Sequence, residues 1–164
     1  MKTLLASVVS VFLLSSCVFE MPFAAQAEIP ITQALLGRWE SIPDSTDSKP
    51  DRLLVLQHSE NEYVVAYPLG DKTMVFRAFP VKLEGAEYVQ LQLIGTVDGP
   101  VEAKDRKYHL LKLKLDGEQL SIQTIKPDVI GKGHKSTAEL LAAFKTHKDD
   151  ADLFDEPETF RRLK

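Results

Sequence analysis

Apolar and polar residues alternate along most of the chain after Ile31, a pattern typical of β-strands that bury one face. In residues 88–95, YVQLQLIG, the valine and the first two leucines occupy every second position and the two glutamines lie between them. In residues 109–115, HLLKLKL, three leucines alternate in the same way with two lysines. These stretches predict strands with one dry and one wet face, as in an antiparallel sheet or the wall of a barrel.

The same alternation predicts about eight strands joined by short connections. A short strand at Trp39 comes first, six strands follow it, and a last one closes the chain. After Trp39 the predicted strands are Arg52–Gln57, Tyr63–Tyr67, Lys72–Leu83, Glu87–Thr96, Lys107–Leu115, Gln119–Lys126 and Glu158–Leu163. Asp116 and Gly117 suit a tight hairpin turn. Because the connections are short, consecutive strands are expected to be neighbours.

Three segments break the β pattern. Residues 31–37 predict a helical turn, with Thr32 as its N-cap and Gly37 as its stop. Residues 43–51, PDSTDSKPD, predict a solvated loop. Ser136 and Glu139 fit a capping box, and the segment ELLAAFKTH that begins at Glu139 predicts an amphipathic helix packed against the sheet.

A sheet with this many strands has to protect its edges, and closure into a barrel removes them. Eight strands enclose an interior that side chains fill or that holds one small ligand. The sequence therefore predicts an all-β domain with one C-terminal helix, in which an antiparallel meander closes into a roughly eight-stranded β-barrel.

The N-terminus has the features of an export signal. It begins Met-Lys and continues with an apolar run over residues 4–14, which is too short to span a membrane. The sequence Leu14-Ser15-Ser16-Cys17 resembles the lipobox of bacterial lipoproteins. This resemblance implies a cut before Cys17, a diacylglyceryl group on its thiol and acylation of the freed amine. Two or three acyl chains make such an attachment effectively permanent.

A second processing site follows the lipobox. Residues 25–27, Ala-Gln-Ala, match an A-x-A secretory site, but Ala27 lies 13 residues beyond Leu14, farther than a signal normally extends. We therefore predict a signal peptide over 1–16, a lipidated tether over 17–30 and a barrel domain over 31–164. For residues 19–23, a first strand or a flap on the domain is an alternative to the tether.

Val18, rather than an aspartate, follows the cysteine. The lipoprotein resemblance then implies a place in the bacterial cell envelope, lipid-anchored at the outer membrane and facing the periplasm.

Composition narrows the possible partners and chemistry. Loss of residues 1–16 removes one lysine and no acid, which leaves 19 basic and 24 acidic residues and a net charge of −5. A nucleic-acid partner would require a basic face, so none is expected. Cys17 is the only cysteine, so the folded domain has no disulfide, thiol nucleophile or thiolate metal site.

The tripeptide Gly37-Arg38-Trp39 follows the helical turn and precedes the first strand and its long loop, and it resembles the Gly-x-Trp motif of lipocalins. The order of elements is similar over nearly the whole mature chain. The resemblance implies an eight-stranded up-and-down barrel with a helix packed outside. It also implies that the tryptophan closes the barrel floor under a late arginine, either Arg161 or Arg162. Our candidates for barrel closure are Gly37, Trp39 and Arg161.

Two residues are candidates for ligand binding. Arg77 shares the face of Val75 and Phe79, and inside a barrel its charge would need a carboxylate or an anionic ligand. The opposite face of that strand is equally apolar, so an exposed or structural arginine is the main alternative. His109 shares the face of Leu111, but its place at the start of a strand favours the barrel rim over a ligand role.

No other pattern indicates chemistry. The four histidines are scattered without metal-ligand spacing, no G-x-S-x-G is present, and the acidic residues lie mostly in turns. We therefore expect no enzyme activity, no metal and no cofactor. The leading hypothesis is a cell-envelope lipoprotein whose barrel binds or carries a small apolar or amphipathic ligand. The alternative is a protein-interaction or inhibitor module with a filled barrel that acts through its loops.

Overall fold

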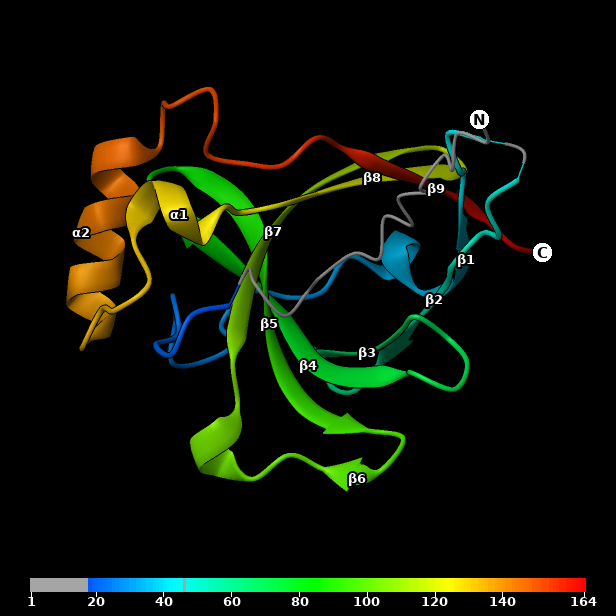
Figure 1. Ribbon diagram of the computed structural model, residues 1–164, viewed down its shortest axis with the longest axis horizontal. Helices are drawn as coiled ribbons and strands as arrows, with labels where there is room; N and C mark the ends of the chain where they lie inside the picture. The colour runs from blue at the N-terminus through cyan, green and yellow to red at the C-terminus, as the bar shows by residue number, and fades with distance from the viewer. Residues whose placement is uncertain (1–17, 46) are drawn as a thin grey trace, which may run out of the picture.

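The strands close into a barrel, as predicted. The computed structural model describes residues 18–45 and 47–164. Within them, eight antiparallel strands form a ring in which β9, from the C-terminus, pairs with both β8 and β1 (Figure 1). These strands are β1 (Gly37–Ser41), β2 (Arg52–Gln57), β3 (Tyr63–Tyr67), β4 (Met74–Leu83), β5 (Ala86–Thr96), β7 (Tyr108–Asp116), β8 (Gln119–Thr124) and β9 (Glu158–Arg162). A two-residue strand, β6 (Gly99–Pro100), extends the edge of β5.

Helical segments lie outside the ring or at one end of it. They are η1 (Gln33–Leu35), η2 (Ala103–Asp105), α1 (Pro127–Ile130) and α2 (Thr137–His147). The helix α2 packs outside the barrel, at the left of Figure 1, where the sequence predicted an amphipathic helix. Its capping residue is confirmed, because the Ser136 hydroxyl accepts a hydrogen bond from the Glu139 N–H at 3.2 Å. The Glu139 carboxylate, however, binds the N–H of Lys135 at 2.8 Å rather than that of Ser136.

The expected Thr32 cap does not form. Its side chain makes no capping bond to η1, and its backbone N–H instead donates to the Tyr63 hydroxyl at 2.7 Å. The β3 tyrosine therefore holds the start of η1 against the barrel, a long-range contact that local sequence does not reveal.

Two hydrophobic clusters stabilise the protein, one inside the barrel and one between its outer wall and the helices. The inner cluster includes Trp39, Leu53, Tyr63, Phe76, Val89, Leu91, Leu120 and Phe160. The outer cluster includes Phe19, Phe23, Phe79, Leu110, Ile125, Leu140, Phe144 and Leu153. Strands such as β4 and β5 are buried on both faces at their centres, because they contribute to both clusters.

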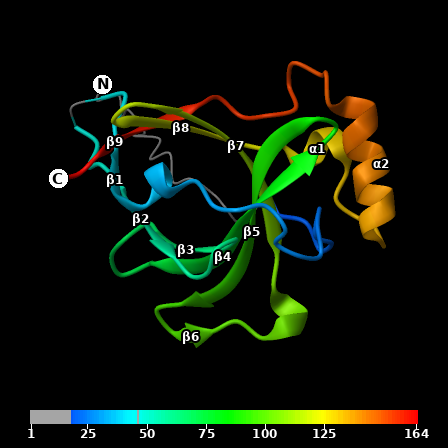
Figure 2. The same ribbon diagram turned by 180° about the vertical axis from the view of Figure 1, so that it is seen from behind.

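Residues 18–30, which we predicted as a tether, pack on the barrel wall instead. We call this segment the N-terminal strap. Phe19 pairs with Tyr108, and the side chains of Phe19 and Phe23 are 3% and 2% exposed. Figure 2 shows the strap in blue, crossing the wall to reach η1. Of the two alternatives for residues 19–23, the flap is the one the structure contains.

The strap also explains why a polar residue on the outer face of β5 is buried. Gln90 points outward from β5, yet it is only 1% exposed. Its amide oxygen accepts hydrogen bonds from the N–H groups of Phe23 and Ala24 at 2.6 and 3.0 Å, and its amide nitrogen donates to the Ala24 carbonyl at 3.0 Å. A buried amide with these bonds fixes an extended segment to the wall.

Candidate functional site

One end of the barrel is closed by a tryptophan and an arginine. Trp39 is fully buried, and its indole N–H donates to the Leu35 carbonyl at 3.0 Å. The Arg162 guanidinium lies 4.2 Å from the centre of the Trp39 ring and donates to the Leu36 carbonyl at 2.8 Å. Gly37 has a φ of +124°, and a Cβ there would lie 3.1 Å from the guanidinium, so this position favours glycine.

The assignment of Arg161 to barrel closure is wrong, because successive residues of a strand point to opposite faces. Arg162 shares the inner face with Phe160, whereas Arg161 points outward. There its Nη2 lies 2.7 Å from a carboxylate oxygen of Glu40. The hydrogen bond from Arg161 lowers the pKa of Glu40, despite the opposing effect of desolvation, and Arg52 adds to the lowering. Arg161 therefore belongs to an ion pair on the outer wall.

Arg77 also lies outside the barrel. Phe76 and Ala78 face the interior cluster, so the intervening side chain of Arg77 points outward. Its Nε donates to the Glu62 carboxylate at 2.9 Å, and its guanidinium lies 5.2 Å from the centre of the Phe79 ring. The Glu62 carboxylate and the Phe79 ring balance the charge of Arg77, so no ligand is needed to account for it.

His109 is inside the barrel rather than at its rim. It is 2% exposed, and its ring meets that of Phe76 edge-to-face with centroids 5.9 Å apart. His109 pairs with Leu91, a residue of the inner cluster, so its side chain shares the interior face. His109 does not line the cavity described next.

A cavity of about 160 Å³ lies at the η1 end of the barrel. It is partly open to solvent, and its lining combines apolar and polar surface from Thr32, Leu35, Tyr63, Pro80, Glu87, Tyr88, Val89, Leu113 and Leu115. Engineered apolar cavities of about 150 Å³ bind benzene or xenon. Burial raises the pKa of Tyr63, which favours the neutral form of its hydroxyl. The cavity thus suits a small apolar group.

Strands β5 and β7 stop pairing with each other next to this cavity. The ladder between β5 and β7 ends at the pair Val89–Leu111. Beyond it, β5 continues with β4 back to Ala86, and β7 continues with β8 to Asp116. Residues 86–88 and 112–116 therefore border a gap in the barrel ladder next to the cavity, and we call this gap the β5–β7 slot.

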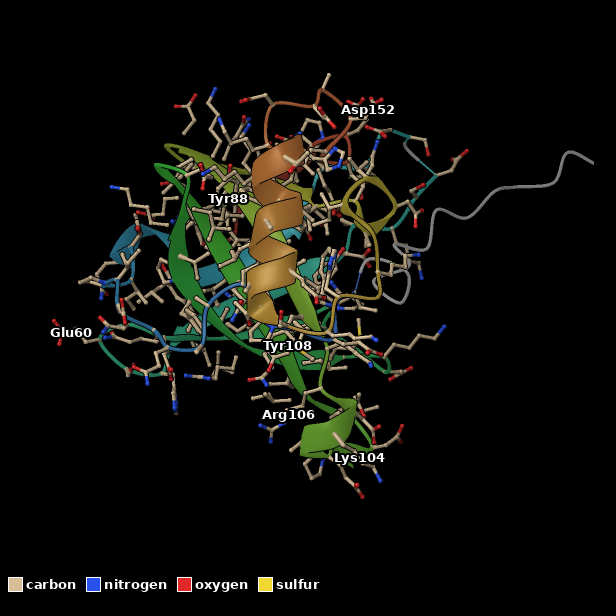
Figure 3. All side chains as sticks on the ribbon, turned by 90° about the vertical axis from the view of Figure 1, so that its left-hand side faces the viewer. Glu60, Tyr88, Lys104, Arg106, Tyr108 and Asp152 are labelled. Carbon is tan, nitrogen blue, oxygen red and sulfur yellow. The ribbon has the colours of Figure 1, made fainter. Side chains whose placement is uncertain are left out.

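Aromatic side chains cover the outer side of the β5–β7 slot. The ring of Phe154 stacks on that of Tyr88, with centroids 5.8 Å apart and planes 6° from parallel. From the β7 side, the Lys112 ammonium lies 5.8 Å from the centre of the same Phe154 ring. Figure 3 shows Tyr88 beside α2, on the face that the helix covers. Sequence alternation did not predict this arrangement, because the arrangement depends on where β5 stays with β4 and β7 stays with β8 after the β5–β7 ladder ends.

The opposite, loop end of the barrel has a different character. Three large apolar side chains are exposed on its connections, Ile42 at 43%, Leu69 at 36% and Val97 at 57%. Inside this end, Glu158 starts β9 on the face of Phe160. Burial and the nearby Asp51 raise the pKa of Glu158 to about 7, although a hydrogen bond with Tyr67 opposes the shift.

No protein-family model, curated protein or solved structure matches this chain. Among residues 18–45 and 47–164, no helix is long and apolar enough to cross a membrane. The same residues contain no cluster of three or more metal-ligating side chains. The predicted signal peptide and Cys17 lie outside the described residues.

Proposed function

We propose that this protein is a cell-envelope lipoprotein, anchored through Cys17, whose barrel binds or carries a small apolar or amphipathic ligand. The observation that carries the ligand-binding role is the cavity of about 160 Å³, whose lining includes Leu35, Leu113 and Leu115. The barrel geometry is also consistent with the lipocalin resemblance, since the Trp39 floor, the outer helix and the closing strand occur in the expected order.

The strap supports a cut before Cys17 rather than after Ala27. A cut after Ala27 would remove Phe19 and Phe23, which are buried in the outer cluster. It would also leave the buried amide of Gln90 without its strap partners. A cut before Cys17 keeps all of these contacts, and this supports our choice of the earlier site.

The anchor is tested by metabolic labelling with an alkyne fatty acid. We expect the protein to be labelled and to fractionate with the outer membrane, and the Cys17→Ser variant to be unlabelled. Labelling of the variant, or a parent protein that begins at Glu28, would contradict the lipoprotein proposal.

The ligand role is tested by native mass spectrometry after exposure to an extract of small molecules from the cell envelope. We expect bound mass on the parent protein and less on Leu113→Phe, in which a ring occupies the cavity. Leu113 is half-buried, so the larger side chain has room to turn into the cavity. A parent protein that retains nothing would contradict the carrier role.

The exposed apolar side chains at the loop end favour a second candidate, a protein-interaction or inhibitor module. They lie on three connections at the same end of the barrel, and contiguous apolar patches on a surface often mark binding sites. Under this alternative, Val97→Ser would weaken partner capture, whereas Leu113→Phe would not. The reverse result would support the carrier.

A further inference from the structure

At the β5–β7 slot, backbone groups that would continue the barrel ladder are not paired between the two strands. Leu93 donates its N–H to the Lys107 carbonyl, so odd-numbered residues of β5 direct their backbone groups toward β7. In this register the pair after Val89–Leu111 would be Glu87 and Leu113, and the ladder ends before it. Both residues line the cavity. Polar backbone groups therefore stand beside an apolar pocket, as in many small-molecule sites.

The charged side chain at the pocket is acidic. Glu87 is the charged residue among those that line the cavity. Lys82 is its register partner on β4 but does not line the cavity, and Lys112 points outward over the Phe154 ring. The Glu87 carboxylate also acts on the interior, because it adds to the larger effect of burial in raising the pKa of Tyr63.

We infer that the β5–β7 slot is a binding site for a small apolar molecule that carries a protonated amine. Its apolar body lies in the cavity against Leu113, Leu115 and Val89. Its ammonium group lies at the slot, where the Glu87 carboxylate and the Leu113 carbonyl accept its N–H bonds. An anionic head would meet the same carboxylate with unfavourable charge, and a purely apolar molecule would leave it unused. This inference rests on the proposed carrier function and narrows its ligand.

The experiment compares three one-ring probes, benzylamine, toluene and benzoate, at pH 7 with the purified full-length protein. Binding is followed by the NMR shifts of the Leu113 and Leu115 methyl groups, which report on the cavity itself. We expect benzylamine to bind up to about fivefold more tightly than toluene, the upper end of the range for an exposed ion pair, and benzoate to bind most weakly.

Two charge variants make the test specific. Glu87→Gln should remove the advantage of benzylamine and leave toluene binding unchanged. Glu84→Gln removes the same charge from the turn of the same hairpin and should leave the order of the probes intact. Both residues are exposed, so neither change is expected to prevent folding.

The outcomes separate this inference from the proposed function. Equal binding of toluene and benzylamine, tighter binding of benzoate, or an unchanged benzylamine advantage in Glu87→Gln would overturn the amine assignment while the carrier function stands. Absence of methyl shifts with all three probes would overturn the carrier function as well. Loss of the benzylamine advantage in Glu87→Gln but not in Glu84→Gln would support the inference.

Discussion

Deletion of the strap residues 18–27 should lower the free energy of unfolding by about 3–6 kcal/mol. The deletion removes the buried side chains of Phe19 and Phe23 from the outer cluster. Burial of each phenylalanine contributes about 1.5–3 kcal/mol, which gives the total. Domains of this kind are stable by about 5–15 kcal/mol, so the loss should be a large fraction of the total stability of the chain that begins at Glu28.

We would measure urea unfolding of two chains, one that begins at Val18 and one that begins at Glu28, and monitor it by the fluorescence of Trp39. A full-strap chain with both phenylalanines changed to alanine should reproduce most of the loss. Glu20→Gln, which changes an exposed strap residue, should stay within about 0.5 kcal/mol of the parent. If the chain that begins at Glu28 unfolds at the same urea concentration as the chain that begins at Val18, the strap is a tether after all and the argument for the Cys17 cut is lost.

Three further predictions concern single side chains. Trp39→Ala should lower the free energy of unfolding by about 3–5 kcal/mol, because it removes the buried aromatic ring under Arg162. Urea unfolding monitored by circular dichroism measures this loss, and an unchanged midpoint would refute the closure role. Phe154→Ala removes the cover of the β5–β7 slot and should speed exchange of toluene in NMR line shapes, whereas unchanged rates would argue against entrance there. The pKa of Glu158 is about 7 in the folded protein and about 4.5 in the unfolded chain. Its protonated carboxyl therefore contributes fully to stability below pH 4.5, and this contribution is lost as the pH rises from about 4.5 to 7. Glu158→Gln should therefore match the parent at pH 4 and exceed it by up to about 3 kcal/mol at pH 8; a pH-independent difference would refute this.

Strand positions were predictable because each strand alternates locally. The bounds of β2 and β3 match the prediction, and those of β4, β5, β7 and β8 differ from it by no more than two residues at either end. The helix cap at Ser136 was also predictable, since capping depends on residues within one turn. Barrel closure followed from the number of strands and the need to protect sheet edges.

The candidate site was much less predictable. The alternation in β4 did not reveal which of its two apolar faces points inward, and the structure places Arg77 on the outer face. The choice between Arg161 and Arg162 depended on strand parity relative to Trp39. The β5–β7 slot was not expected at all, because it forms where β5 follows β4 and β7 follows β8 away from each other.

The sequence by itself determined the strands, the outer helix and the barrel class, because these follow from hydrophobic periodicity within short stretches. Only the tertiary structure decided that the segment after Cys17 is a strap, that Gln90 is buried and that Glu87 borders a cavity. Each of these outcomes depends on contacts between residues far apart in the chain, such as the 67 positions between Phe23 and Gln90. The local hydrophobic pattern shows which side chains are buried in each strand or helix, whereas the tertiary structure decides which segments cover them.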